Sequence, residues 1–287
     1  MLVAALAWEP CPALGGQPRV NVLVSIIPQK FFVKKIGADR VTVEAMVRPG
    51  ANPATYEPKP SQMSALAGAD IYFAIGVLFE KTWMPKIGAA SPRMKIVHTQ
   101  QGIEKIPMAS FLNPKTPDHQ KKHRHGTLDP HIWLSPPLVK RQAINIYHAL
   151  VEADPLHRDQ YEVNYRRFVR ELEDLDTHLR HTFADQQGLE FMVFHPSWGY
   201  FAQAYGLRQV PVEVEGKTPK PRQLKRLIEH ARDRGIHLIF VQPQFSRKSA
   251  DLIAQAVSAR VVEADPLAED WEQNLRRQAI AIKGALK

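Results

Sequence analysis

Short apolar runs rich in β-branched residues alternate with segments of helical periodicity along most of the chain. Two sets of four runs occur, at 20–27, 41–47, 70–76 and 95–99 and then at 191–195, 207–214, 237–243 and 259–265. Alternating strands and helices are typical of parallel sheets flanked by helices, and two separate sets favour two α/β lobes. We therefore predict an N-terminal lobe over 19–150 and a C-terminal lobe over 188–287, each with a mostly parallel sheet.

The segment between the two sets has the periodicity of one long amphipathic helix. Its apolar residues recur at steps of three and four from Tyr161 to Phe183. Asp154 is suited to cap the first turn, and Pro155 suits the first helical position. A helix from Asp154 to about residue 185 would be on the order of 45 Å long. We predict that this rigid helix, within 151–187, connects the two lobes.

The N-terminal segment MLVAALAWEPCPALGGQP resembles a secretory leader. It lacks the positively charged start of such a leader, so either the first residues are missing or the start codon is misplaced. We expect residues 1–18 to be a leader and the protein to be exported to the periplasm or another extracytoplasmic space. Cys11 is the only cysteine, which excludes an intramolecular disulfide and a thiolate metal cluster.

The composition is that of a globular protein, with 44% apolar and 23% charged residues. No apolar run approaches the roughly 18 to 20 residues that a membrane-spanning helix needs. The net charge of +9 comes from Lys and Arg residues scattered over helix faces, without aromatic interleaving or a nucleic-acid-binding motif. We therefore expect no nucleic-acid partner, and we expect a monomer.

Three polar residues follow or precede structural elements in a way that suits a metal site. His195 ends the apolar run FMVF, Asp265 ends ARVVEA, and His131 precedes a helix in LDPHIWLSP. Ligands of open α/β sheets collect beyond the carboxyl ends of the strands. Imidazole nitrogen and carboxylate oxygen both suit zinc, so these three residues are our candidate ligands. Each of them alone also has an ordinary explanation, as a hydrogen-bonding residue at a strand end or a turn former.

Five motifs, in order, resemble those of the zinc- and manganese-binding solute receptors of bacterial ABC importers. They are RPGANPATYEPKPSQM, DPHIWLSP, FHPSWGYFAQAYGL, IFVQPQFSRKSADLIAQAV and VVEADPLAED. The resemblance implies two α/β lobes joined by a long rigid helix, with a metal held between them and delivered to a membrane permease. It also implies that His131 and His195 match two histidine ligands of the family and that Asp265 matches its carboxylate ligand.

One expected ligand is missing, because Ala54 stands where the family places a histidine in a PHTYEP-like run. Water is the simplest substitute. Glu57 in the same loop and Glu215 after a C-terminal-lobe strand are further candidates for the vacant position.

A His-rich segment, HQKKHRHGTLDPHIW, precedes and includes His131. We hypothesise that His131 is a fixed ligand and that His119, His123 and His125 form a capture loop. One of these three histidines then supplies the ligand that is missing at Ala54. Replacing these three with alanine is then expected to lower the stoichiometry or the affinity of zinc binding in calorimetric titrations. Unchanged titrations would reject the capture loop.

Nitrogen-rich coordination favours zinc as the bound metal, with manganese or another divalent transition metal as the alternative. Two rival functions remain. The first is a binding protein or adhesin of the same fold with an altered or lost metal site, which the missing ligand at Ala54 would explain. The second is a metal-dependent hydrolase. The chain lacks an HExxH helix, a Gly-x-Ser-x-Gly elbow and a phosphate-binding Gly loop, so we expect no enzymatic activity, no catalytic residue and no cofactor other than the metal.

Overall fold

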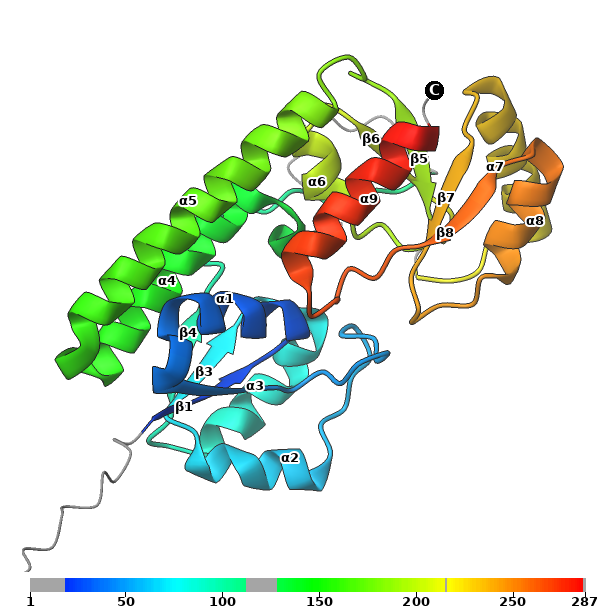
Figure 1. The fold of residues 1–287 in the computed structure, drawn as a ribbon. Coiled ribbons are helices and arrows are strands. Elements are labelled where there is room, and N and C mark those ends of the chain that lie inside the picture. Colours follow the sequence, from blue (N-terminus) through cyan, green and yellow to red (C-terminus); the bar gives the residue numbers. More distant parts are fainter. Residues whose placement is uncertain (1–18, 112–127, 215, 286–287) are drawn as a thin grey trace, which may run out of the picture.

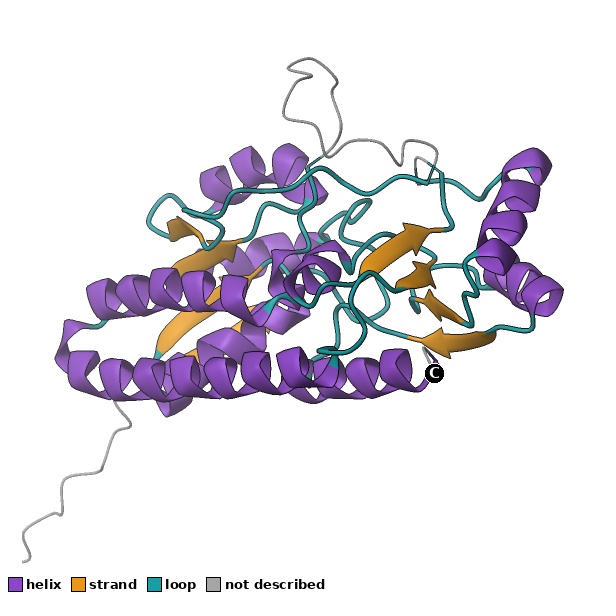
Figure 2. Cartoon of the chain, turned by 90° about the horizontal axis from the view of Figure 1, so that it is seen from above, coloured by secondary structure: helices purple, strands orange, loops and turns teal. Residues whose placement is uncertain are grey.

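The computed structural model describes residues 19–111, 128–214 and 216–285 and shows two α/β lobes (Figure 1). The predicted leader at 1–18 lies outside these residues. Each lobe has a parallel four-stranded sheet, and the strands of the two sheets form two separate groups (Figure 2). The predicted fold class is therefore confirmed.

The N-terminal sheet has the strand order β2-β1-β3-β4. Its strands are β1 (Val20–Val24), β2 (Val41–Ala45), β3 (Ile71–Ala74) and β4 (Lys95–His98). The C-terminal sheet repeats this arrangement with the order β6-β5-β7-β8. Its strands are β5 (Glu190–Val193), β6 (Arg208–Pro211), β7 (Leu238–Val241) and β8 (Arg260–Glu263). All eight strands fall within or overlap the apolar runs that predicted them, because parallel strands covered on both faces are built from continuous apolar residues.

Helices cover the sheets and connect the lobes. The α-helices are α1 (Ile27–Gly37), α2 (Pro60–Ala65), α3 (Leu78–Ala90), α4 (Pro136–Ala153), α5 (Arg158–Thr182), α6 (Gly199–Ala204), α7 (Pro221–Asp233), α8 (Lys248–Val257) and α9 (Trp271–Ala285). Short 3₁₀ turns are η1 (Ala38–Arg40), η2 (Leu66–Gly68), η3 (Ile132–Leu134) and η4 (Pro155–His157). No helix in the described part of the chain has both the length and the apolar character to cross a membrane.

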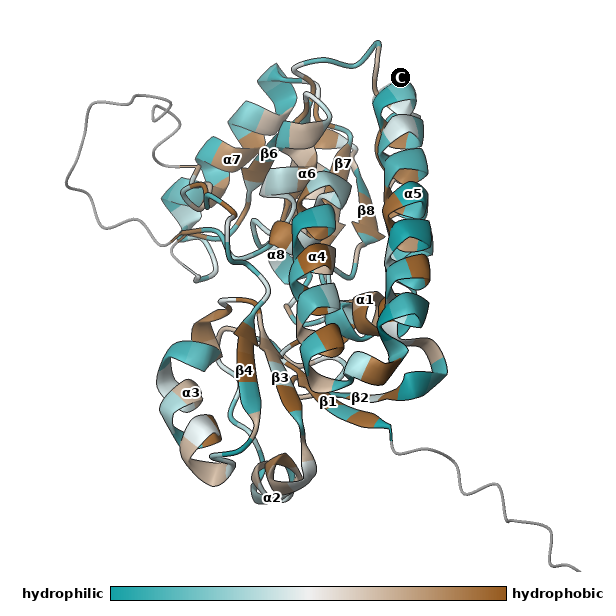
Figure 3. Cartoon of the chain, turned by 90° about the vertical axis from the view of Figure 1, so that its left-hand side faces the viewer, coloured by the Kyte–Doolittle hydropathy of each residue, from teal (hydrophilic) through white to brown (hydrophobic). Residues whose placement is uncertain are grey.

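Helix α5 is the predicted connecting helix. It packs against α1 in the N-terminal lobe and against α9 in the C-terminal lobe. Its buried side chains follow the predicted spacing, and Figure 3 shows brown hydrophobic positions interrupting a mostly teal helix. A rigid rod that contacts both lobes limits how far they can move apart.

The start of this helix differs from the prediction. Pro155 begins a 3₁₀ turn, η4, and the α-helix begins only at Arg158. The Asp154 side chain caps no backbone N–H group. Its carboxylate instead lies 2.8 Å from Nδ1 of His157 and accepts a hydrogen bond of 2.7 Å from the Tyr161 hydroxyl. These two side-chain partners take the oxygens that a cap would have used.

One hydrophobic core cluster extends through both lobes. Trp271 at the start of α9 packs against Phe31 and Phe32 of α1, with ring centroids 5.8 and 5.1 Å apart. Its indole N–H donates to the carbonyl of Trp133 at 2.7 Å, and the Trp133 indole donates to the carbonyl of Pro266 at 2.7 Å. This pair of tryptophans ties the C-terminal lobe to the N-terminal lobe next to the candidate site.

Candidate functional site

His131 lies between the lobes, just before η3, and is 7% exposed. Its backbone N–H donates to Oδ1 of Asp129 at 2.8 Å, and its ring Nδ1 lies 2.7 Å from the same oxygen. The two contacts close a small ring between residues 129 and 131, which fixes the direction of the imidazole. Asp129 is fully buried, so solvent does not compete for this carboxylate.

His195 lies two residues after the end of β5, at the strand end where the sequence predicts it. Its main chain is held by Gln242, whose amide accepts from the His195 N–H at 3.2 Å and donates to the His195 carbonyl at 2.6 Å. Its ring Nδ1 lies 2.9 Å from Oε1 of Glu213, and its ring stacks on Phe245 with centroids 5.0 Å apart. Backbone, ring nitrogen and ring face are therefore all fixed.

The two imidazoles meet across the boundary between the lobes. Their ring centroids lie 5.2 Å apart, with an interplanar angle of 72°. A carboxylate only accepts hydrogen bonds, so in the neutral form of each ring Nδ1 carries the proton and Nε2 has the lone pair. Carboxylates that orient histidines in this way are a common feature of metal sites, because they fix the tautomer and raise the basicity of the ligand. The arrangement leaves one ligand nitrogen on each ring available for a metal.

The electrostatic surroundings of the pair suit a cation. Oδ2 of Asp129 and Oε2 of Glu213 are both buried and lack a hydrogen-bond partner within the described part of the chain. Burial lowers the pKa of the His131 imidazole, against the opposing influence of Asp129. Lys105 interacts electrostatically with Asp129. His131 is therefore neutral near pH 7, as a metal ligand must be, beside two buried carboxylates whose charge would be balanced by a divalent ion.

Asp265 lies next to residues that contact both histidines. Its Oδ1 accepts from the Gln244 amide at 3.1 Å and from the Leu267 N–H at 2.9 Å. Gln244 precedes Phe245, which stacks on His195. On the other side, Trp133 bonds the Pro266 carbonyl and has its ring 5.0 Å from that of His131.

These links bring Asp265 near the histidine pair without a direct hydrogen bond to either imidazole. Among the described residues, no group of three or more His, Cys, Asp or Glu side chains has an arrangement that could hold a metal. The structure therefore brings two of the three predicted ligands together, and the role of Asp265 stays a prediction.

The remaining candidates are less well placed or lie outside the described residues. Glu57 is exposed in the loop after β2. Ala54 is in the same loop, where its N–H donates to the Asn52 side chain at 2.8 Å. The candidates outside the described residues are His119, His123, His125 and Glu215.

Sequence reasoning missed the two carboxylates that orient the histidines. Asp129 stands two positions before His131 in the DPH triplet, and this spacing was the available signal. Glu213 follows β6 by two residues and is 7% exposed. The sequence points to Glu215 instead, because that residue also follows a C-terminal-lobe strand, and periodicity alone does not assign a side chain beyond the end of a strand to one face.

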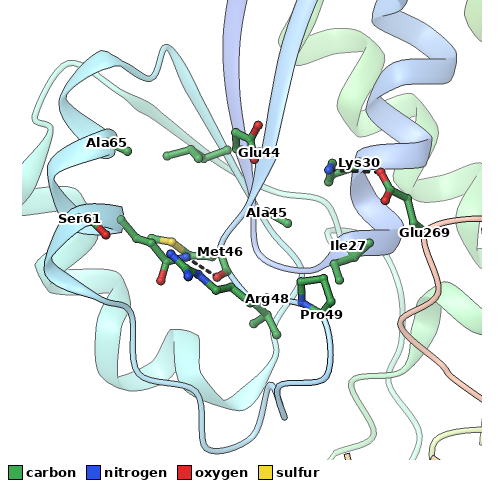
Figure 4. Close-up of a pocket in the computed structure, with 13 residues that line it drawn as sticks. Ile27, Lys30, Glu44, Ala45, Met46, Arg48, Pro49, Ser61, Ala65 and Glu269 are labelled. Atoms are coloured by element: carbon green, nitrogen blue, oxygen red, sulfur yellow. Dashed lines mark hydrogen bonds and ion pairs between the residues drawn. The ribbon is translucent and has the colours of Figure 1, made fainter. Parts of the chain in front are cut away.

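A separate cavity of about 410 Å³ lies in the N-terminal lobe, away from the histidine pair (Figure 4). It lies between α1, β2 and α2, and Lys30 and the C-terminal-lobe residue Glu269 form an ion pair of 3.3 Å at its edge. Neither His131 nor His195 lines it.

Comparison with known proteins identifies the family. The family of periplasmic zinc-uptake complex component A, ZnuA, matches residues 22–285. A crystal structure of ZnuA is 43% identical, with a TM-score of 0.87, and covers 94% of this chain and 100% of that chain. A zinc-bound ZnuA deletion mutant is also 43% identical, with a TM-score of 0.85, over 94% of this chain and 98% of that chain.

A curated relative agrees with the structural matches. The high-affinity zinc uptake system protein ZnuA of Bacillus subtilis is 27% identical over 246 residues, which cover 84% of this chain and 76% of that protein. The family match spans both lobes, the connecting helix and both histidines. The chain belongs to the ZnuA family of periplasmic zinc-uptake proteins.

Proposed function

We propose that this chain binds one zinc ion between its lobes through His131 and His195 and delivers it to the membrane permease of an ABC importer. The observation that supports the proposal best is the meeting of the buried His131 imidazole and the half-buried His195 imidazole, one from each lobe, at 5.2 Å between ring centroids. Zinc is the cargo of the protein, held reversibly, and not a resident cofactor. Asp265 is the proposed third ligand, and water completes the site in place of the histidine that Ala54 replaces.

The nitrogen donors favour zinc over manganese in this proposal, since manganese prefers oxygen ligands and higher coordination. The zinc-bound relative at 43% identity supports the same choice. A same-fold adhesin without a metal would have no need for two histidines oriented by buried carboxylates. Membership of a zinc-uptake family supports a binding protein over a hydrolase.

Several organisational features belong to the same proposal. We propose a leader over 1–18, lobes over 19–150 and 188–287, and a connecting segment over 151–187 that includes α5. We also propose that the protein acts as a monomer and that His119, His123 and His125 form the capture loop, whose replacement by alanine lowers zinc stoichiometry or affinity.

Elemental analysis of gently purified protein, followed by competition with a chromogenic zinc chelator, tests the proposed cargo. We expect one zinc per chain, and manganese that competes only weakly. Protein that contains no zinc and does not withdraw zinc from the chelator would refute the proposal.

Zinc affinity is expected to depend on pH. Zinc binds the neutral imidazole, so protons compete with it as the pH falls. Desolvation is the main influence on His131 and lowers its pKa; Asp129 and Glu213 act in the raising direction, and His195 acts in the lowering direction. His131 therefore stays ready to bind zinc in mildly acidic solution, where an ordinary histidine, with a pKa near 6.5, is partly protonated.

We expect nearly constant affinity between about pH 8 and about pH 6.5, and a progressive loss at lower pH, where the His131 imidazole, whose pKa is lowered, becomes protonated. Chelator competition at a series of pH values, with the chelator calibrated at each, measures this profile. A flat profile down to about pH 5 would contradict histidine ligation.

A further inference from the structure

Asp129, which orients His131, is itself held by main-chain hydrogen bonds. Its N–H donates to the Ile106 carbonyl at 2.8 Å. Its carbonyl accepts from the Tyr200 hydroxyl at 2.9 Å, and that hydroxyl accepts from the Ile106 N–H at 3.1 Å. One phenol group therefore ties together the two chain segments, around residues 106 and 129, that position the carboxylate.

Tyr200 comes from the other lobe. It lies in α6, is 3% exposed, and packs with the core cluster that extends through both lobes. Burial raises the pKa of Tyr200 to about 12, so its hydroxyl keeps the proton that it donates to Asp129. Helix α6 also contacts η3, the turn that follows His131. The N-terminal-lobe histidine is thus supported from the C-terminal lobe.

The approach of α6 to Asp129 is close enough to require a glycine. A Cβ atom added at Gly199 would lie 2.8 Å from Oδ2 of Asp129 and 2.9 Å from the Gln209 amide. Both atoms would have to move to admit a methyl group. The absent side chain at position 199 therefore lets the C-terminal lobe contact the carboxylate that holds His131.

His195 and Tyr200 lie on one continuous segment, FHPSWGYF, five residues apart. A displacement of this segment would withdraw His195 from the site. It would also remove the Tyr200 hydroxyl from Asp129, the residue that orients His131. We propose that Tyr200 is a positioning residue that couples docking of the C-terminal lobe to the orientation of His131. This inference rests on the proposed function, because it concerns the same zinc site.

Tyr200→Phe tests this coupling, since it removes the hydroxyl and leaves the ring in place. The variant leaves the Ile106 N–H and the Asp129 carbonyl without their partner. We expect the zinc affinity to fall about 10-fold, at the lower end of the effects found for groups that orient metal ligands. We also expect the visible absorption spectrum of the cobalt-substituted protein to change, because that spectrum reports ligand geometry.

Tyr205→Phe is the matched control. Tyr205 follows α6, is 2% exposed, and donates a hydrogen bond of 3.1 Å to Asp176, a residue of α5. Both variants lose a buried hydroxyl, so both are expected to lower the melting temperature. Only Tyr200→Phe is expected to change zinc affinity and the cobalt spectrum.

Combination with Asp129→Asn tests whether Tyr200 acts through the carboxylate. If it does, the double variant loses less affinity than the product of the two single losses, because both changes disturb the same contact with His131. Gly199→Ala is the alternative variant if Tyr200→Phe does not fold. Its added methyl group displaces the Asp129 carboxylate, so we expect the same loss of zinc affinity.

The outcomes separate this inference from the proposed function. Wild-type protein that does not bind zinc would refute the proposed function. Wild-type protein that binds zinc, together with a Tyr200→Phe variant of unchanged affinity and cobalt spectrum, would overturn the coupling alone. Strict additivity with Asp129→Asn would also overturn it.

Discussion

Replacement of His195 by alanine is expected to lower the zinc affinity by more than about 100-fold, beyond the 10- to 100-fold typical of groups that merely orient ligands. The substitution removes one of the two imidazoles that meet between the lobes. It also leaves the buried carboxylate of Glu213 without its partner, 2.9 Å away in the intact protein. Competition with a chromogenic chelator near pH 7.5 measures the loss.

His148→Ala is the control for this experiment. His148 is exposed on α4, so the His148→Ala variant lacks one imidazole but leaves the candidate zinc site undisturbed. We expect its zinc affinity to equal that of the wild type. A His195→Ala variant that binds zinc as tightly as His148→Ala would show that zinc binds elsewhere on the chain.

Replacement of Trp271 by alanine is expected to lower the free energy of unfolding by about 3–5 kcal/mol, the usual effect of removing a large buried aromatic side chain. Trp271 is 1% exposed and packs on Phe31 and Phe32 across the lobe boundary. Its loss also leaves the Trp133 carbonyl without the indole donor. Urea denaturation, followed by circular dichroism, measures the change.

Trp83→Ala provides a comparison with a less buried tryptophan. Trp83 lies on α3 at intermediate exposure, with the Lys86 ammonium 4.3 Å from its ring centroid. We expect a loss of about 1 kcal/mol or less for this variant. Because the core cluster extends through both lobes, wild-type unfolding is expected to be a single transition. Equal destabilisation by the two variants would contradict the role of Trp271 in joining the lobes.

Much of the fold was predictable because its elements are encoded locally. The β-branched runs predicted every described strand, and the spacing of Tyr161, Phe168, Leu172, Leu175 and Leu179 predicted α5. The helix start was less predictable. Asp154 could have capped the helix, but His157 and Tyr161 take its oxygens, and that choice depends on their side-chain positions.

The site was predictable to a lesser extent. His131 and His195 precede or follow elements whose ends meet in a two-lobed α/β fold, and the family resemblance strengthened the choice. The family match confirms the predicted solute-binding class, the periplasmic location and the absence of an enzymatic role. Glu213 and Tyr200 act through contacts between segments far apart in the sequence, which no local pattern encodes, whereas Asp129 lies only two residues before His131.

A crystal structure of the zinc-loaded protein, with anomalous diffraction recorded on both sides of the zinc absorption edge, tests the central claim most directly. The account predicts one strong zinc peak between the lobes, bonded to Nε2 of His131 and to Nε2 of His195 at about 2.0–2.1 Å. A zinc peak elsewhere on the chain, with both of these nitrogens unligated, would contradict it.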